Sequence, residues 1–212
     1  MRASAAADPT VFVVDDEAEI RDALALLMKS IALRAVTYPG PQAFLAAYQR
    51  DHYPACLLLD LRMPGMSGLD LFAELKRRGS RMPAIIMTAH GEVSVAVRAM
   101  KAGVFDFIEK PFKDQALLDL VQHALAQCSQ AVDQAAQHGE IAARARSLTP
   151  RERQVMDLVV TGRLNKLIAA DLGLSARTVE LHRARVMEKM QAKTFSDLVR
   201  MTIGLQRDEP AA

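Results

Sequence analysis

Short apolar runs alternate with helix-length amphipathic segments through the first 125 residues of the chain. The runs at 10–14, 55–59 and 84–87 are continuously apolar instead of alternating in polarity. Continuous runs are typical of strands that are buried on both faces of a sheet. The regular alternation of strand and helix therefore predicts an α/β fold, a doubly wound five-stranded parallel sheet.

The predicted elements of this sheet follow from the same pattern. The five strands are expected at 10–14, 34–37, 55–59, 84–87 and 105–108. Helices are expected at 17–31, 41–50, 67–78 and 92–102, and a fifth begins near Asp114.

Polar residues end the apolar runs. They are Asp15, Asp16, Asp60, Thr88 and Lys110, the last of which is followed by Pro111. In a parallel sheet these strand ends share one edge, where ligands bind in such folds. Each residue alone also has a plainer explanation: Asp16 as a helix cap, Thr88 as a turn cap and Lys110 as a surface cation.

Three carboxylates at one edge repel each other unless a cation lies among them. Ligands that are all oxygen select a hard ion such as Mg²⁺. With Lys110 in reach, such a site neutralises a phosphoryl group while one carboxylate attacks phosphorus. The loop after Asp60, with Pro64, Gly65 and Gly68, lets the backbone bend around metal and phosphate.

Residues 114–147 are expected to form one helix that continues past the sheet domain as an Ala- and Gln-rich linker. Gly139 is its only helix breaker and marks a possible joint. The linker is either a solvated helix without further function or a helix that carries a signal or forms a dimer.

The chain after residue 147 contains helical signals only. Capping boxes and Gly173 predict four helices, at 150–161, 166–172, 176–190 and 196–205. Gly173, between two short helices, indicates a helix-turn-helix. Residues 146–207 hold 12 Lys and Arg against 6 Asp and Glu, whereas residues 1–125 hold 14 against 15. The basic C-terminal part is therefore the candidate for a polyanion partner.

The predicted helix 176–190 has two different faces. Val179, Val186 and Met190 share one face, and Leu181 lies on or near the opposite one together with arginines. A leucine surrounded by cations fits a helix in the DNA major groove, with Leu181 and Ala184 against thymine methyl groups.

Five motifs in the first 125 residues carry a resemblance to a known family. VVDDE, LLLDLRMPGMSGLDL, IIMTAHG, AVRAMKAG and FDFIEKPF occur in order over residues 9–125. Together they resemble a two-component response-regulator receiver domain, which has the flavodoxin-like fold.

The resemblance implies that Asp60 is the residue phosphorylated by a sensor histidine kinase. Asp15, Asp16 and Asp60, with the backbone carbonyl of Arg62, would hold Mg²⁺. The remaining implied roles fall on the other strand ends. Lys110 would pair with the acylphosphate, and the Lys110–Pro111 bond would be cis. Thr88 would couple phosphate to an inward turn of Phe107, which repacks the surface of residues 92–108.

Two further positions flank the line of attack by water. They are Arg62, two residues after Asp60, and His90, two residues after Thr88. We hypothesise that they set the lifetime of the phosphoryl group, against the alternative that both are solvated loop residues.

The segment LTPRERQVMDLVVTGRLNKLIAADLGLSARTVELHRARVMEKM resembles the LuxR-type DNA-binding domain, also called the NarL/FixJ type, over residues 146–207. The resemblance places Glu180, Leu181 and Ala184 toward base edges. Four cationic or imidazole side chains are assigned to phosphate: Lys166, Arg177, His182 and Arg185. His182 has the alternative of a packing residue, and Leu167 stands where the family commonly has Glu.

These features predict three parts: a receiver at 1–125, a helical linker at 126–146 and an all-α four-helix helix-turn-helix domain at 147–212. The expected function is a response regulator in which phosphorylation of Asp60 switches dimerisation or DNA binding and so regulates transcription. Its expected partners are a sensor histidine kinase, double-stranded DNA, RNA polymerase and, on phosphorylation, a second copy of the chain. It is not expected to be an enzyme beyond its own phosphorylation and dephosphorylation.

Two other functions compete with this interpretation. A Mg²⁺-dependent phosphohydrolase would carry an Asp-x-Asp loop, but the second residue after Asp60 is Arg62. A receiver that acts without phosphate is disfavoured because Asp60, Thr88 and Lys110 are intact.

The chain has no apolar run long enough to span a membrane and no signal-peptide core, so we expect a cytoplasmic protein without a membrane partner. Cys56 and Cys128 lack the spacing of a metal or redox motif, so each is expected to be a small packing residue.

Overall fold

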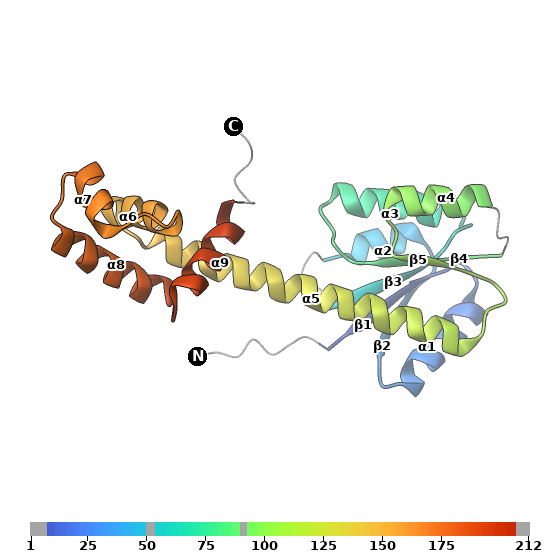
Figure 1. The fold of residues 1–212 in the computed structure, drawn as a ribbon. Coiled ribbons are helices and arrows are strands. Elements are labelled where there is room, and N and C mark those ends of the chain that lie inside the picture. Colours follow the sequence, from blue (N-terminus) through green and yellow to red (C-terminus); the bar gives the residue numbers. More distant parts are fainter. Residues whose placement is uncertain (1–7, 50–53, 90–92, 207–212) are drawn as a thin grey trace. The chain divides into compact units, whose positions relative to one another are not determined.

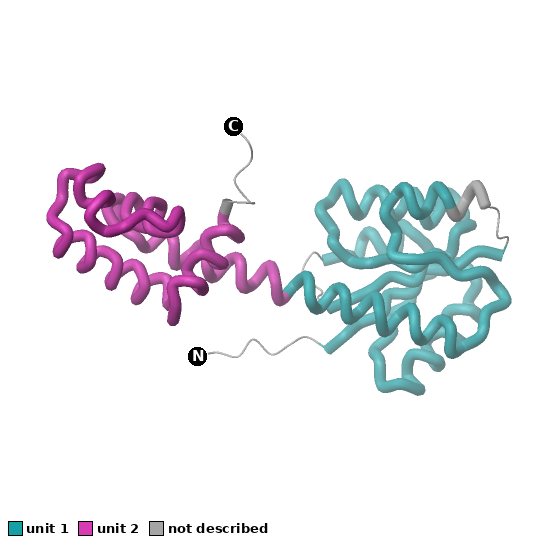
Figure 2. The backbone as a smooth tube through the Cα atoms, viewed as in Figure 1, with its two compact units in different colours: residues 1–132 teal, residues 133–212 magenta. Residues whose placement is uncertain are grey.

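The computed structural model describes residues 8–49, 54–89 and 93–206, so His90 lies outside the described part. The chain divides into two compact units, residues 1–132 and 133–212 (Figure 2). This division lies within the linker predicted at 126–146. The three-part division made from the sequence stays a prediction.

The first unit contains the predicted parallel sheet, in the strand order β2-β1-β3-β4-β5 (Figure 1). The strands are β1 (Thr10–Val14), β2 (Arg34–Tyr38), β3 (Ala55–Asp60), β4 (Ala84–Thr88) and β5 (Asp106–Glu109). The helices of this unit are α1 (Ala18–Ser30), α2 (Pro41–Ala47), α3 (Gly68–Arg77), α4 (Val93–Ala102) and the start of α5 (Asp114–Arg146). The predicted fold class is confirmed.

Helices cover both faces of the sheet, with α1 and α5 on one face and α2, α3 and α4 on the other (Figure 1). Phe12 and Val14 of β1 pack in the core beneath α2 and α3, whereas Val11 and Val13 pack in the core beneath α1 and α5. Because successive side chains of a strand point to opposite faces, burial on both faces requires the continuous apolar runs seen in the sequence. Cys56 and Cys128 are free and buried, as expected of packing residues.

Helix α5 is continuous through Gly139, so the possible joint predicted there does not interrupt it. A side chain added at Gly139 would meet no atom within 4 Å, which leaves this glycine in an open position on the helix. Leu117 and Val121 of α5 pack in the core of the first unit, whereas Ile141 and Ala145 pack in the core of the second.

The second unit is helical, as predicted. After the end of α5 it contains α6 (Pro150–Val160), α7 (Asn165–Leu172), α8 (Ala176–Met190) and α9 (Phe195–Gln206). Gly173 ends α7 in the left-handed conformation with a φ of 65°, and Ser175 caps α8 by accepting a hydrogen bond from the Thr178 N–H. Within the described residues, no helix has the length and apolar character needed to cross a membrane.

Candidate functional site

Two acidic side chains and one lysine meet at the carboxyl edge of the sheet. Lys110, directly after β5, donates hydrogen bonds from Nζ to Asp15 Oδ2 at 2.9 Å and to Asp60 Oδ1 at 2.7 Å. Asp15 is fully buried and Asp60 is 9% exposed. The topology brings these residues together from β1, β3 and β5, as the sequence predicted.

Asp60 is the last residue of β3, and its carboxylate is fixed from two sides. Its Oδ2 accepts a hydrogen bond from the Arg62 backbone N–H at 2.6 Å, and its Oδ1 faces Lys110. Gly68, the first residue of α3, packs so closely that an added Cβ would lie 2.3 Å from the Asp60 carbonyl oxygen. Only glycine allows α3 to start this close to the end of β3.

Burial dominates the electrostatics of Asp60. It raises the pKa of the carboxyl, and the hydrogen bonds from Lys110 and Arg62 offset part of this rise. Burial alone would lower the pKa of Lys110, but the hydrogen bonds to Asp60 and Asp15 hold that pKa above its usual value. The lysine is therefore a fixed cation beside a carboxylate whose side chain is 12% exposed.

The turn between β1 and α1 carries the other two acidic residues. Asp15 Oδ1 accepts a hydrogen bond from the Glu17 N–H at 2.9 Å, which fixes its second oxygen toward Lys110. Arg21 of α1 donates from Nη1 to the carbonyl oxygens of Asp15 and Asp16, at 2.8 and 2.9 Å. The side chain of Asp16 is exposed.

The donor chemistry of this edge fits Mg²⁺, because its carboxylate oxygens are hard ligands that come close enough to share one cation. The predicted trio of carboxylates is nevertheless not assembled. Among the described residues, no three His, Cys, Asp or Glu side chains are grouped to hold a metal. Asp15 and Asp60 both bind the Lys110 ammonium, whereas the side chain of Asp16 is exposed.

The remaining predicted residues of this edge lie beside the cluster. Thr88, the last residue of β4, is 4% exposed, and its carbonyl accepts a hydrogen bond from the Lys110 N–H at 2.7 Å. The Lys110–Pro111 peptide bond is cis, as expected. Phe107 of β5 is 36% exposed, so its ring is not part of the core.

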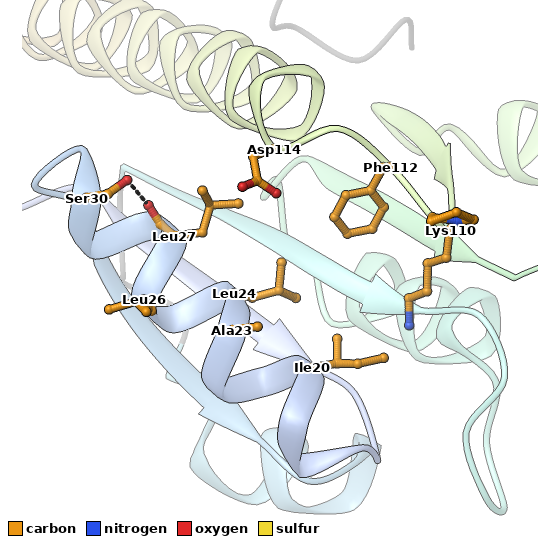
Figure 3. A pocket seen from close by; sticks show the side chains of 10 residues that line it. Ile20, Ala23, Leu24, Leu26, Leu27, Ser30, Lys110, Phe112 and Asp114 are labelled. Atoms are coloured by element: carbon orange, nitrogen blue, oxygen red, sulfur yellow. Dashed lines mark hydrogen bonds between the residues drawn. The ribbon is translucent and has the colours of Figure 1, made fainter.

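Two apolar surfaces lie outside the acidic cluster. On α4 and β5, Val97, Met100 and Phe107 are large apolar side chains that remain exposed. On the other side, α1 and the segment after β5 enclose a groove of about 630 Å³ whose walls include Ile20, Leu24, Leu27, Lys110, Phe112 and Asp114 (Figure 3). Leu26 of α1, which also lines the groove, is 70% exposed.

The predicted nucleic-acid interface lies on α7 and α8 of the second unit. Its exposed residues are Lys166, Arg177, Glu180, Leu181, Ala184 and Arg185. Val179, Val186 and Met190 are buried, so the two faces of α8 are divided as the sequence predicted. Leu181 is 52% exposed.

His182 differs from the other candidate contacts of α8. It is half-buried, and its Nδ1 is buried without a hydrogen-bond partner in the described part of the chain. This position favours the packing alternative for His182 over a free phosphate contact.

Several side-chain contacts of the second unit were not predicted from the sequence. Arg183 Nη1 donates to Asn165 Oδ1 and so ties α8 to the start of α7. Glu152 is almost fully buried, closes a capping box with Thr149 and pairs with Lys189 Nζ at 2.6 Å. The only sequence signal for Glu152 was its capping-box spacing, and Arg21 and Arg183 had none.

Comparison with known proteins gives a match over each unit. Residues 11–122 match the family described as "Response regulator receiver domain", and residues 146–202 match "Bacterial regulatory proteins, luxR family". The transcriptional regulatory protein FixJ of Bradyrhizobium diazoefficiens is 44% identical over 193 residues, which cover 91% of this chain and 94% of FixJ.

Solved structures show the same relationship. The response regulator StyR is 38% identical with a TM-score of 0.83, over 93% of this chain and 99% of StyR. Full-length FixJ from B. japonicum is 42% identical with a TM-score of 0.58, over 93% of this chain and 97% of FixJ.

Proposed function

Because the chain belongs to the two-component response regulators that join a receiver to a LuxR-type DNA-binding domain, we propose that it is switched by phosphorylation of Asp60. The family consists of transcription regulators and not of catalytic enzymes. The receiver implies a histidine kinase as partner, and the helix-turn-helix implies DNA. The observation that carries the proposal is the Asp60 carboxylate, which is held beside Asp15 by Lys110 and keeps part of its surface exposed.

In the proposed reaction an oxygen of Asp60 attacks the phosphorus of a phosphohistidine on the kinase. The bond from phosphorus to the histidine nitrogen breaks, and an aspartyl phosphate forms. Receivers generally use Mg²⁺, which here would be held by Asp15, Asp16, Asp60 and the Arg62 carbonyl and would neutralise phosphoryl charge. Lys110 donates a hydrogen bond to a phosphoryl oxygen, because its ammonium already contacts Asp60 Oδ1.

Thr88 and Phe107 are proposed to convert the new phosphate into a change of surface. The Thr88 hydroxyl donates to a phosphoryl oxygen, and the exposed Phe107 ring turns inward into the space that Thr88 leaves. The phosphoryl group adds about −1.5 to −2 charges and needs only to bias an existing equilibrium.

The α4 and β5 surface is the proposed site where two phosphorylated receivers pair. Val97, Met100 and Phe107 supply exposed apolar area on it, and burying that area against a second copy is favourable. Pairing of two chains brings two α8 helices to a two-fold DNA site. Contact with RNA polymerase then links DNA binding to transcription.

The groove on α1 is the proposed docking site for the kinase. Its wall combines apolar side chains of α1 with Lys110, so a helix that occupies it lies next to the phosphorylation site (Figure 3). Helix-in-groove docking buries the leucines of α1 and leaves Asp60 reachable.

Light scattering of the full chain with Mg²⁺ and beryllofluoride, a phosphoryl mimic, tests the proposal. We expect the mass to change from monomer to dimer in the native chain but not in Asp60→Asn. A constant mass despite bound beryllofluoride would exclude dimerisation as the output, and absence of binding would exclude Asp60 as the acceptor.

A further inference from the structure

The turn between β1 and α1 is held by a side chain outside the acidic cluster. Arg21 lies half-buried in α1, and its Nη1 donates to the carbonyl oxygen of Asp15 at 2.8 Å and to that of Asp16 at 2.9 Å. A guanidinium Nη carries two hydrogens, so one nitrogen can serve both carbonyls. Arg21 thereby fixes the direction of two successive peptide groups.

The direction of these peptide groups determines where the acidic side chains point. Asp15 Oδ1 is bound by the Glu17 N–H, and its other oxygen faces Lys110. Three hydrogen bonds therefore hold a turn in which one carboxylate is fully buried and the next is exposed. If the Asp15 and Asp16 carbonyls were released, the peptide between them could rotate and move both side chains.

We propose that Arg21 is a positioning residue for the divalent-cation site, acting through the backbone of Asp15 and Asp16. This inference rests on the proposed function, which assigns Mg²⁺ to these carboxylates. Side chains that orient metal ligands from outside the coordination shell typically contribute 10- to 100-fold to metal affinity. Arg21 occupies such a position, because it contacts the ligand residues only through their carbonyl oxygens.

Charge and geometry predict opposite effects of removing Arg21. As a cation next to an acidic site, Arg21 repels Mg²⁺, so its loss through charge alone would strengthen Mg²⁺ binding. As the residue that fixes the turn, its loss would weaken Mg²⁺ binding. The sign of the change therefore separates positioning from simple electrostatics.

The test is calorimetric titration of Mg²⁺ into the full chain and its variants. Arg21→Met is expected to weaken Mg²⁺ binding by about tenfold or more. Arg21→Lys keeps the charge, but its side chain is shorter than that of arginine and its ammonium does not reach both carbonyl oxygens from the same backbone position, so it should restore only a small part of the affinity. Lys29→Met removes an exposed charge near the end of the same helix and should leave the affinity within about twofold.

Folding is followed separately, by urea unfolding with EDTA present. An Arg21→Met chain that is folded and binds Mg²⁺ as well as or better than the native chain overturns the inference, as does full affinity in Arg21→Lys. Asp16→Asn serves to test the premise. If the native chain binds no Mg²⁺, or if Asp16→Asn binds Mg²⁺ as well as the native chain does, the assigned metal site is wrong. If the native chain binds Mg²⁺ and Arg21→Met binds it equally well, only the role of Arg21 is refuted.

Discussion

The two units use buried charge for different purposes. In the first unit, Asp15, Asp60 and Lys110 meet at a sheet edge where Asp60 remains reachable. In the second unit, Glu152 is equally buried, but its pairing with Lys189 joins α6 to the end of α8. The residues expected to contact DNA are instead exposed on α7 and α8.

The difference shows that burial of a charged group does not by itself identify a functional site. A buried ion pair that closes a helix cap stabilises the fold, and because its two charges balance each other it does not attract a further ion. A buried pair of carboxylates that shares one lysine is balanced only in part, so it retains affinity for a further cation or a phosphoryl group. Perturbing each cluster should therefore have different consequences.

The largest effect is expected from Lys110→Met, which leaves two carboxylates at the edge without their cation. We expect the receiver to lose about 3–5 kcal/mol of unfolding free energy in EDTA. Added Mg²⁺ should restore part of that loss. Tyrosine fluorescence follows the receiver alone, since all three tyrosines precede residue 54. Lys113→Met is the control, and equal stability of the two variants would contradict this account of the cluster.

A smaller but still severe effect is expected from Gly68→Ala. The added methyl group would lie 2.3 Å from the Asp60 carbonyl oxygen, so α3 or the end of β3 must move. We expect a loss of about 3 kcal/mol, at the upper end for overpacking, together with impaired beryllofluoride binding.

The matched control is Gly139→Ala, because a Cβ there meets no atom within 4 Å. Alanine inside a helix should stabilise the protein by about 0.5–1 kcal/mol. Urea unfolding followed by circular dichroism gives the change in unfolding free energy for each variant. If both changes had the same sign, close packing would not explain why residue 68 is glycine.

The ion pair of the second unit predicts a pH dependence. The hydrogen bond from Lys189, followed by that from the Thr149 N–H, lowers the pKa of Glu152 from 4.5 to about 2. A lowered pKa means that the ionised carboxylate stabilises the folded state above about pH 4.5 and that this stabilisation is lost as the pH falls toward 2.

Glu152→Gln should therefore cost about 1–2 kcal/mol at pH 7 and almost nothing near pH 2. The loss is measured by circular dichroism, and tyrosine fluorescence should not follow it, since residues 133–212 contain no tyrosine. Glu140→Gln breaks an exposed pair with Arg144 and should cause neither the loss of unfolding free energy at pH 7 nor the pH dependence of that loss.

The smallest effects on stability are expected on the exposed face of α8. Leu181→Ala and Arg177→Ala should each change the unfolding free energy by no more than about 0.5 kcal/mol. In DNA-binding titrations, Arg177→Ala should weaken all sequences alike and reduce the salt slope by about 1, whereas Leu181→Ala should reduce discrimination between sequences. A uniform loss in both variants would place Leu181 outside the base-reading set.

The sequence was sufficient to predict the sheet and the meeting of Asp15, Asp60 and Lys110. Continuous apolar runs identify buried parallel strands, and the topology then places their carboxyl ends at one edge. The division of α8 into Val179 and Leu181 faces was predictable for a similar reason, because the helical period alone determines it.

Other features depend on side-chain contacts that no period encodes. Asp15 and Asp60 meet at Lys110, whereas the exposed side chain of Asp16 is not grouped with them in the described residues, so its place in a metal site stays a prediction. Arg21 donates to backbone carbonyl oxygens, which every residue has, so the sequence does not indicate these contacts. The bond from Arg183 to Asn165 joins residues 18 positions apart whose approach depends on how two helices cross.

The sharing of Lys110 by Asp15 and Asp60 has a consequence for folding during synthesis on the ribosome. Lys110 is synthesised 95 residues after Asp15 and 50 residues after Asp60. Until β5 emerges, a nascent sheet of β1 and β3 carries two neighbouring carboxylates with no counter-charge from the chain itself. Strand β5 is an outer strand of the sheet, and Lys110 directly after it supplies the cation that balances the two carboxylates. The complete receiver therefore forms late in its synthesis.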